Sequence, residues 1–282
     1  MNIYHARYFV DAAREGSVSR AAERNGVTHS AVSQAIRSLE SHFGVGLLDH
    51  AKRRFELTDA GRTCFEELGA LLAAHESARQ RIAESDGVVR GELSLMAPQS
   101  LYIRALYGAL GAFREKYPRV RLELQTGAAA LVRSGVAEGR AQIGILVDDG
   151  FTDRFSSKVL RAGEFRLVGP RPREKVGARD LIVTSKEKVE TLHLRKRLPA
   201  PLRAKWADAL EVVSWTVIRR LAEHGLGHGY VPDYVVEDDL RAKRLYAVEA
   251  PGRPFRYEIR AIWAAGREPH ANARRFLDLL KL

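Results

Sequence analysis

Residues 17–43 constrain the fold more than any other stretch, because they carry the features of two short helices joined by a tight turn. Ser17 and Thr28 are N-cap residues, and the pair Asn25-Gly26 between them favours a turn. Beyond Thr28, apolar side chains recur at helical spacing: Val32, Ile36, Leu39 and Phe43. The opposite face carries polar groups suited to base edges and phosphates: His29, Ser30, Ser33, Gln34 and Arg37. The pattern predicts a helix-turn-helix, with an ordinary helical hairpin as the alternative.

A short basic hairpin is predicted directly after this segment. Residues 47–50 and 54–57 form two strand-like runs on either side of Ala51, Lys52 and Arg53. A winged helix-turn-helix places such a tip on the DNA backbone or in the minor groove. Lys52, Arg53 and Arg54 are therefore candidate contacts to DNA.

Several motifs follow one another through this part of the chain: Ser17-Val18-Ser19-Arg20-Ala21-Ala22, Ser30-Ala31-Val32-Ser33-Gln34-Ala35-Ile36, Leu39-Glu40, Phe43-Gly44-Val45, Leu47-Leu48 and Leu57-Thr58-Asp59-Ala60-Gly61. In order and spacing they resemble the N-terminal domain of the LysR-type transcriptional regulators. Many relatives have Gln and Pro where this chain has His29 and Ser30, so its base preference need not follow theirs. The resemblance implies a winged helix-turn-helix over residues 1–58 that binds double-stranded operator DNA, with Ser17 and Thr28 also at the DNA.

A long helix is predicted to follow, because Thr58 can cap it and a heptad seam runs through residues 59–86. The seam consists of Gly61, Cys64, Leu68, Leu71, His75, Ala78 and Ile82. A helix of this length spans roughly 40 Å and has little core of its own to bury against, so a partner helix is expected. The resemblance implies that residues 59–90 form a linker and dimerisation helix with a hinge.

Residues 91–282 change to strands alternating with helices. The first expected elements are a strand at 92–97, a helix at 101–117, a strand at 120–124, a helix at 131–139 and a strand at 141–147. This βαβαβ order predicts a parallel sheet. Further strands are expected at 165–168, 181–184, 228–232 and 261–263, with a last helix at 271–280.

Two lobes joined by two crossings are expected from this order, with residues 91–160 and 265–282 in lobe I and residues 161–264 in lobe II. Residues 113–118 and 222–232 resemble, more loosely, the effector domain of the same family. The overall expectation is an α+β multidomain protein: a winged helix-turn-helix, a linker helix and a two-lobed α/β domain like the periplasmic binding proteins. Residues 186–209 match poorly, and no structure is predicted for them.

A ligand in an open α/β sheet binds beyond the carboxyl ends of the strands. In lobe I this rule selects Pro98, Gln99, Ser100, Gly127, Ala128, Leu146 and Asp148, and in lobe II it selects Thr184, Ser214 and Trp215. Their alternative role is that of ordinary loop residues. In the resembling family, this cleft binds a small-molecule effector, for which an anion is one candidate.

The net charge of +11 is not located in the proposed DNA-binding part. Residues 1–90 hold 12 basic and 12 acidic residues, so the whole surplus lies in residues 91–282. The densest basic stretch is 161–205. It is either a solvated surface, or a surface that attracts an anionic effector, DNA or an acidic partner.

The remaining sequence features favour a cytoplasmic protein that is not an enzyme. Cys64 is the single cysteine, the chain opens without the pattern of a secretory signal, and no stretch has the roughly 20 apolar residues of a membrane span. The glycines of 225–229 follow a helix and precede a strand, which is the reverse of a dinucleotide-binding loop. His224 and His228 have no third ligand at metal spacing, and no nucleophile, base and orienting group come together. Neither a cofactor nor a metal is expected.

The resemblance also implies partners. It predicts a homodimer that pairs into a homotetramer, with RNA polymerase as a further partner and no membrane. Effector binding would change the angle between dimers and thus the bend in the DNA. The alternative function is that of a solute-binding protein or an enzyme with an appended helical domain.

Overall fold

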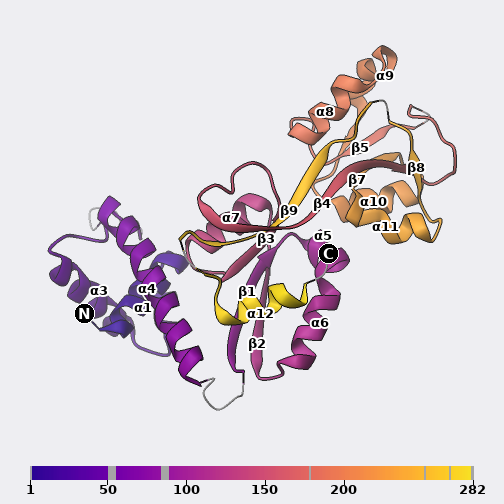
Figure 1. Cartoon of the computed structure of the whole chain (residues 1–282). Coiled ribbons are helices and arrows are strands. Elements are labelled where there is room, and N and C mark those ends of the chain that lie inside the picture. Colours follow the sequence, from indigo (N-terminus) through magenta and orange to yellow (C-terminus); the bar gives the residue numbers. More distant parts are fainter. Residues whose placement is uncertain are drawn as a thin grey trace.

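The computed structural model describes residues 2–49, 55–83, 89–177, 179–250, 252–266 and 268–280 (Figure 1). Its first part is a helical domain of α1 (Ile3–Glu15), α2 (Val18–Asn25) and α3 (His29–Phe43), with α4 (Asp59–Ala83) packed beside it. Ser17 and Thr28 cap α2 and α3 as expected, since their side chains accept from backbone N–H groups three residues further on. Gly26 in the turn between them has φ +63°, a conformation that favours glycine. The expected helix-turn-helix is present.

The core of this domain explains the apolar spacing of the sequence. Val32, Ile36 and Leu39 of α3 are almost completely buried and pack with Phe9 and Val10 of α1. Phe43, the last member of the expected stripe, is 45% exposed. The core therefore ends one turn before the helix does.

The predicted hairpin is present but short. Within the described residues, it consists of one antiparallel bridge between Leu48 and Leu57, flanked by backbone hydrogen bonds from the N–H of Asp49 to the carbonyl of Glu56 at 2.9 Å and from the N–H of Thr58 to the carbonyl of Leu47 at 3.1 Å. Two side chains add hydrogen bonds at its base. Glu40 accepts from the backbone N–H groups of Leu47 and Leu48, and the Thr58 hydroxyl donates to the carbonyl of Gly46. The tip, with Lys52, Arg53 and Arg54, lies outside the described residues.

The two halves of the heptad seam in α4 differ in burial. Leu68 is buried in the core of the helical domain, and Gly61 lies so close to this domain that a Cβ there would be 2.1 Å from the carbonyl oxygen of Leu47. Further along the same seam, Leu71 is 40% and Ile82 is 73% exposed. The first half of the seam is therefore satisfied within the chain, and the second half is open.

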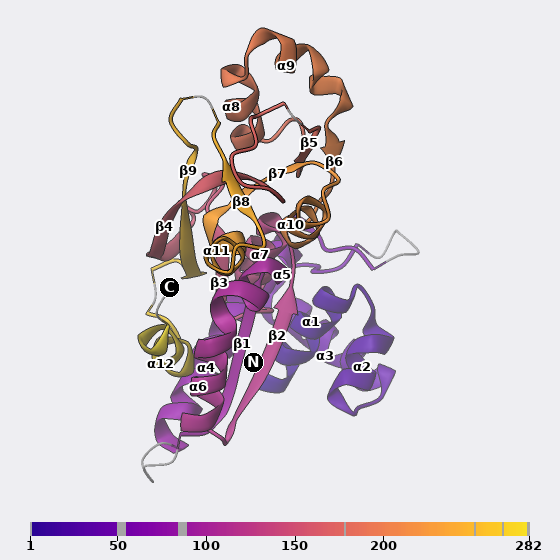
Figure 2. The ribbon, with the colours of Figure 1, turned by 90° about the vertical axis from the view of Figure 1, so that its right-hand side faces the viewer.

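The rest of the chain forms a mixed sheet that passes through two lobes (Figures 1 and 2). In lobe I, β1 (Gly91–Ala97) pairs in parallel with β2 (Val120–Thr126) and β3 (Ile143–Val147), which confirms the expected parallel sheet. The helical elements of lobe I are α5 (Gln99–Leu101), the π-helix η2 (Tyr102–Leu106), α6 (Tyr107–Lys116), α7 (Ala129–Ala137) and the terminal α12 (Ala271–Leu279).

Lobe II contains β5 (Leu181–Val183), β6 (Leu210–Glu211), β7 (His228–Pro232) and β8 (Tyr246–Val248). Its longer helices are α8 (Val189–Arg197), α10 (Trp215–Glu223) and α11 (Asp233–Arg241). The stretch for which the sequence predicted no structure forms α8, the short α9 (Ala200–Ala204) and the 3₁₀ turn η3 (Lys205–Asp208).

Two long strands belong to both lobes, and this differs from expectation. The strand expected at 165–168 is the end of β4 (Phe155–Gly169), and the strand expected at 261–263 is the end of β9 (Arg256–Ala264). They pair antiparallel along their length, with an irregularity between Val159 and Arg161. Strand β9 joins β3 from Ile259 onward, so the chain returns to lobe I earlier than residue 265.

Candidate functional site

Helix α3 presents the polar face that the sequence predicted. Thr28, His29, Ser30, Gln34 and Arg37 are exposed, and Ser33 is half-buried with its hydroxyl 3.5 Å from Nδ1 of His29. Residues spaced by three and four lie on one side of a helix, so this row faces away from the core contacts of Val32 and Ile36. The result is a rigid helix, anchored on one side, that offers an amide, hydroxyls and a guanidinium on the other.

Two of the predicted DNA-binding hydroxyls have structural partners. The Ser17 side chain accepts from the N–H of Arg20 at 3.3 Å, and that of Thr28 accepts from the N–H of Ala31 at 3.2 Å. Both hold the starts of helices, so they orient the helix-turn-helix.

The predicted ligand-binding loops of lobe I lie side by side at the carboxyl edge of its sheet. The register pairs Ala97 with Thr126, and the N–H of Gly127 donates to the carbonyl of Ala97 at 3.3 Å. This brings Pro98, Gln99 and Ser100 next to Gly127 and Ala128. Gln99 and Ala128 are exposed, whereas Ser100 is buried. The strand-end rule therefore brought these five residues together.

Lobe II reaches across to this edge and covers Ser100. The Ser100 hydroxyl lies 2.8 Å from the hydroxyl of Tyr234 on α11, and both side chains are buried. One turn further along, Arg104 of η2 donates to the carboxylate of Asp239 on α11 at 3.1 Å. The two lobes are thus held together by a hydrogen bond between hydroxyls and by an ion pair.

Asp239 is the centre of a larger cluster. Its side chain is fully buried and contacts three guanidinium groups, those of Arg104, Arg219 and Arg244. Burial alone would raise the pKa of Asp239, but hydrogen bonds from Arg219 and Arg244 and the charges of Arg219 and Arg104 lower it below its ordinary value. Burial raises the pKa of the Tyr234 hydroxyl. At neutral pH, Asp239 is therefore a carboxylate and the Tyr234 hydroxyl is a neutral phenol.

Several of the predicted effector-binding residues instead pack in the core or pair with other side chains. Leu146 is wholly buried with Met96 and Val132 and presents no surface to a ligand, which corrects its assignment. This follows because residues along a strand alternate between faces and Leu146 points to the face covered by α7. Asp148 pairs with Arg260 at 2.8 Å and accepts from the N–H of Gly150 at 2.9 Å.

The lobe II candidates differ among themselves. Thr184 is buried, with its hydroxyl 3.4 Å from Glu190, and Ser214 caps α10 by accepting from Val217. Trp215 packs edge-on against Tyr234, and within the described residues its indole N–H has no hydrogen-bond partner. Of these three, Trp215 is the side chain that retains an unused polar group beside the junction.

Arg104, Tyr234 and Asp239 are the junction residues that sequence reasoning missed. Their contacts join positions more than 130 residues apart, which no local pattern records. One signal was available for Asp239. It lies three and four residues after Val236 and Val235, on the apolar face of an amphipathic helix, where a carboxylate requires a buried partner.

The part of the chain that the structure describes contains no group of three or more His, Cys, Asp and Glu side chains placed to hold a metal ion. Among the same residues, no helix has both the length and the apolar character needed to cross a bilayer.

A helix-turn-helix joined by a long helix to a two-lobed binding domain defines a class of ligand-responsive DNA-binding proteins, and comparisons with known families identify which one. Residues 3–62 match the family described as bacterial regulatory helix-turn-helix protein, lysR family, and residues 86–281 match the LysR substrate binding domain. The chain belongs to the LysR family of DNA-binding transcriptional regulators and carries that family's effector-binding domain.

A relative and two solved structures match this chain over nearly its full length. The chain is 27% identical over 287 residues to the transcriptional regulator YeiE of Escherichia coli, covering 96% of this chain and 94% of YeiE. A full-length OxyR variant from Pseudomonas aeruginosa has a TM-score of 0.72 at 17% identity, with 100% and 98% coverage. Full-length LysG from Corynebacterium glutamicum, solved with its bound effector Arg, has a TM-score of 0.68 at 15% identity and covers both chains completely. At these identities, the structural likeness shows the fold.

Proposed function

We propose that this regulator reads operator DNA with the exposed face of α3 and that a small molecule at the lobe junction modulates the binding. The observation that carries the proposal is the row of exposed polar residues on a helix whose other side is anchored in a core. The chain then acts by binding and not by catalysis, in the compartment that holds the chromosome, the cytoplasm.

Each DNA-facing residue has a role that follows from its chemistry. Gln34 can bond an adenine edge through both amide atoms, a contact worth about 1–3 kcal/mol of discrimination. Ser30 and Ser33 add hydroxyls to base edges. Arg37 lies one turn further along and contacts phosphate, as do Lys52, Arg53 and Arg54 of the wing tip. His29 at the start of α3 is positioned at the edge of this face.

The open half of α4 supports a homodimer as the DNA-binding unit. Leu71 and Ile82 continue a heptad seam, yet they are exposed in one chain, and a second α4 would cover them. Two-fold pairing of the helix-turn-helix domains predicts dyad-related half-sites spaced by whole turns of about 10 bp. Pairing of dimers into a tetramer and contact with RNA polymerase complete the proposed assembly.

The proposed effector site consists of the lobe I edge at 98–100 and 127–128 with Trp215 opposite. Tyr234 occupies one hydrogen-bonding position of Ser100 at this edge, so an effector that uses that position replaces the tyrosine hydroxyl. LysG, which shares the fold, binds the amino acid Arg as its effector. Because the whole net positive charge lies in residues 91–282, anionic metabolites are the first class to screen.

The test is fluorescence anisotropy with DNA from upstream of the protein's own gene, measured across a salt series. Wild type should bind specifically in the nanomolar range. Gln34→Ala should lose discrimination between specific and unrelated DNA, and Arg37→Ala should weaken both and reduce the salt slope by about one. Arg114→Ala is the matched control, since Arg114 is exposed on α6 in lobe I.

The proposal is wrong if Gln34→Ala and Arg37→Ala bind specific DNA as wild type does. Equal losses in Arg114→Ala would also contradict it, because they would indicate a general effect of positive charge.

A further inference from the structure

An arginine of the DNA-binding domain closes a helix of the effector domain. Nε and Nη2 of Arg14, on α1, donate to the carbonyl oxygen of Glu138 at 3.3 and 3.1 Å, and Nη2 also donates to the carbonyl of Gly139 at 3.1 Å. These carbonyls lie directly after the last turn of α7. A guanidinium at a helix C-terminus satisfies free carbonyls and complements the negative end of the helix dipole.

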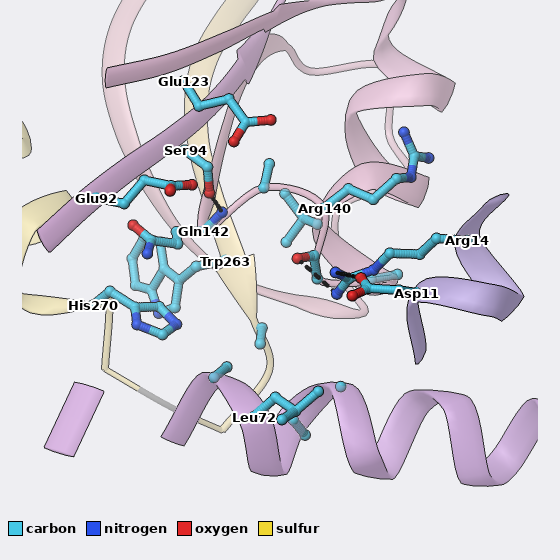
Figure 3. A pocket seen from close by; sticks show the side chains of 18 of the residues that line it. Asp11, Arg14, Leu72, Glu92, Ser94, Glu123, Arg140, Gln142, Trp263 and His270 are labelled. Carbon is cyan, nitrogen blue, oxygen red and sulfur yellow. Dashed lines mark hydrogen bonds and ion pairs between the residues drawn. The ribbon is translucent and has the colours of Figure 1, made fainter. Parts of the chain in front are cut away.

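The guanidinium of Arg14 is held in place from its own side. Asp11, one turn earlier on α1 and itself buried, lies 3.5 Å from Nη1 of Arg14. Asp11 in turn is held by Asn25 at 2.9 Å and by Arg24 at 3.6 Å. Figure 3 shows Asp11 and Arg14 pointing from α1 toward lobe I, at one end of a cavity of about 660 Å³ between the two domains. The donor, Arg14, and its two acceptors, the carbonyls of Glu138 and Gly139, are therefore each held in a defined position.

Helix α7 continues from this contact to the proposed effector site. Its N-cap is Ala128, which lies beside Gly127 and Pro98 at the lobe junction. Arg133, in the middle of α7, pairs with Asp149 in the loop after β3. A nine-residue helix is about 13 Å long, so one rigid element joins the cleft to the DNA-binding domain.

Packing leaves α7 little freedom to bend between these ends. A Cβ on Gly135 of α7 would be 2.6 Å from the sulfur of Met96, and a Cβ on Gly144 of β3 would be 2.6 Å from a methyl of Val132. Such close approach means that a shift at one end moves the helix as a whole.

At the other side, α1 packs directly against α3. Phe9 and Val10 of α1 share a core with Val32 and Ile36 of α3. A change in the position of α1 therefore changes how α3 is presented.

We propose that Arg14 docks the DNA-binding domain onto the C-terminal end of α7, and that α7 thereby couples the effector cleft to the recognition helix through α1. The docking contact is independent of any ligand, whereas the coupling rests on the proposed effector site at the other end of α7. The contact is intramolecular, between α1 and lobe I of the same chain.

The test is hydrogen–deuterium exchange of the full-length protein, without DNA or effector, in wild type, Arg14→Gln and Arg20→Gln. In Arg14→Gln, amides at the interface end of α7 (Gly139 and Ala141) should exchange about tenfold faster, and that of Val132 at the cleft end about threefold faster. Arg20→Gln is the matched control, because Arg20 is exposed on α2, in the same domain, and no described contact joins its side chain to Asp11, Arg14 or lobe I.

Arg14→Lys keeps the charge but loses the forked donor, so it should give a smaller increase than Arg14→Gln. The amide of Leu95, inside β1, serves as the reference for an intact lobe I. Unchanged exchange at Gly139 and Ala141 would overturn the docking contact. Faster exchange there with Val132 unchanged would overturn the coupling. Both results are distinct from a failure of DNA binding, which this measurement does not require.

Discussion

Replacing Asp239 by Asn tests the junction between the lobes most directly. The Asp239 side chain is fully buried and forms ion pairs with Arg104, Arg219 and Arg244, whose side chains are 15%, 15% and 46% exposed. Asn keeps the shape and one acceptor but removes the buried charge that the three cations share, leaving them only the longer contacts of Arg104 with Asp238 and of Arg219 and Arg244 with Glu223 at 3.6–4.0 Å. Removing one partner of a buried ion pair costs about 3–5 kcal/mol. Because Arg244 can turn toward water, we expect the lower end, about 3 kcal/mol.

The assay is thermal unfolding followed by tryptophan fluorescence. All three tryptophans, Trp206, Trp215 and Trp263, lie in the effector domain, so the signal reports that domain alone. For a domain of this size, each kcal/mol shifts Tm by about 2–4 °C, so Asp239→Asn should lower Tm by about 6–12 °C. Asp238→Asn is the control: the Asp238 carboxylate also lies beside Arg104, at 3.9 Å, but it is 56% exposed, and exposed pairs contribute less than about 1 kcal/mol. Equal shifts in the two variants would refute the reasoning.

Three further outcomes are expected. Gly61→Ala should destabilise the helical domain by about 3 kcal/mol or more, because the new Cβ would be 2.1 Å from a backbone oxygen. Gly69→Ala should stabilise this domain by about 0.5–1 kcal/mol, because the new Cβ would meet no atom within 4 Å. Urea unfolding followed by circular dichroism measures both free energies. The pKa of Asp239 is lowered by folding, so its contribution is complete above the ordinary value of 3.8 and is lost in acid; the Tm difference between wild type and Asp239→Asn should be constant at about pH 5–8 and shrink below about pH 4. Tyr234→Phe should cost about 0.5–1.5 kcal/mol, and Ser100→Ala should add nothing further to it in unfolding measurements of the double variant.

The N-terminal part was largely predictable because its signals are local. Capping residues, a turn glycine and apolar spacing each act within one or two helical turns, and together they defined α2 and α3. The hairpin expected at 47–50 and 54–57 is shorter within the described residues, where the backbone pairs at 47–49 and 56–58 and the side chains of Glu40 and Thr58 reinforce its base. Local patterns do not reveal which partner satisfies the backbone.

The effector domain was predictable as an order of elements but not as a junction. The strand-end rule placed Pro98, Ser100 and Gly127 together because parallel strands end at one edge. It failed for Leu146, since a residue at the end of a strand can still point into the core. The closing contacts from α11 depend on how two lobes meet, which no spacing within either lobe encodes.

The shared strands β4 and β9 limit how this protein can be divided. A fragment of lobe II cut at residues 161 and 258 would begin and end inside strands, and each cut would leave unpaired N–H and C=O groups. Such open edges pair readily with other chains, so isolated lobes should aggregate where the intact domain does not. Gene fusions, split reporters and truncations should therefore treat residues 91–280 as indivisible and insert new sequence at exposed loops such as 171–173.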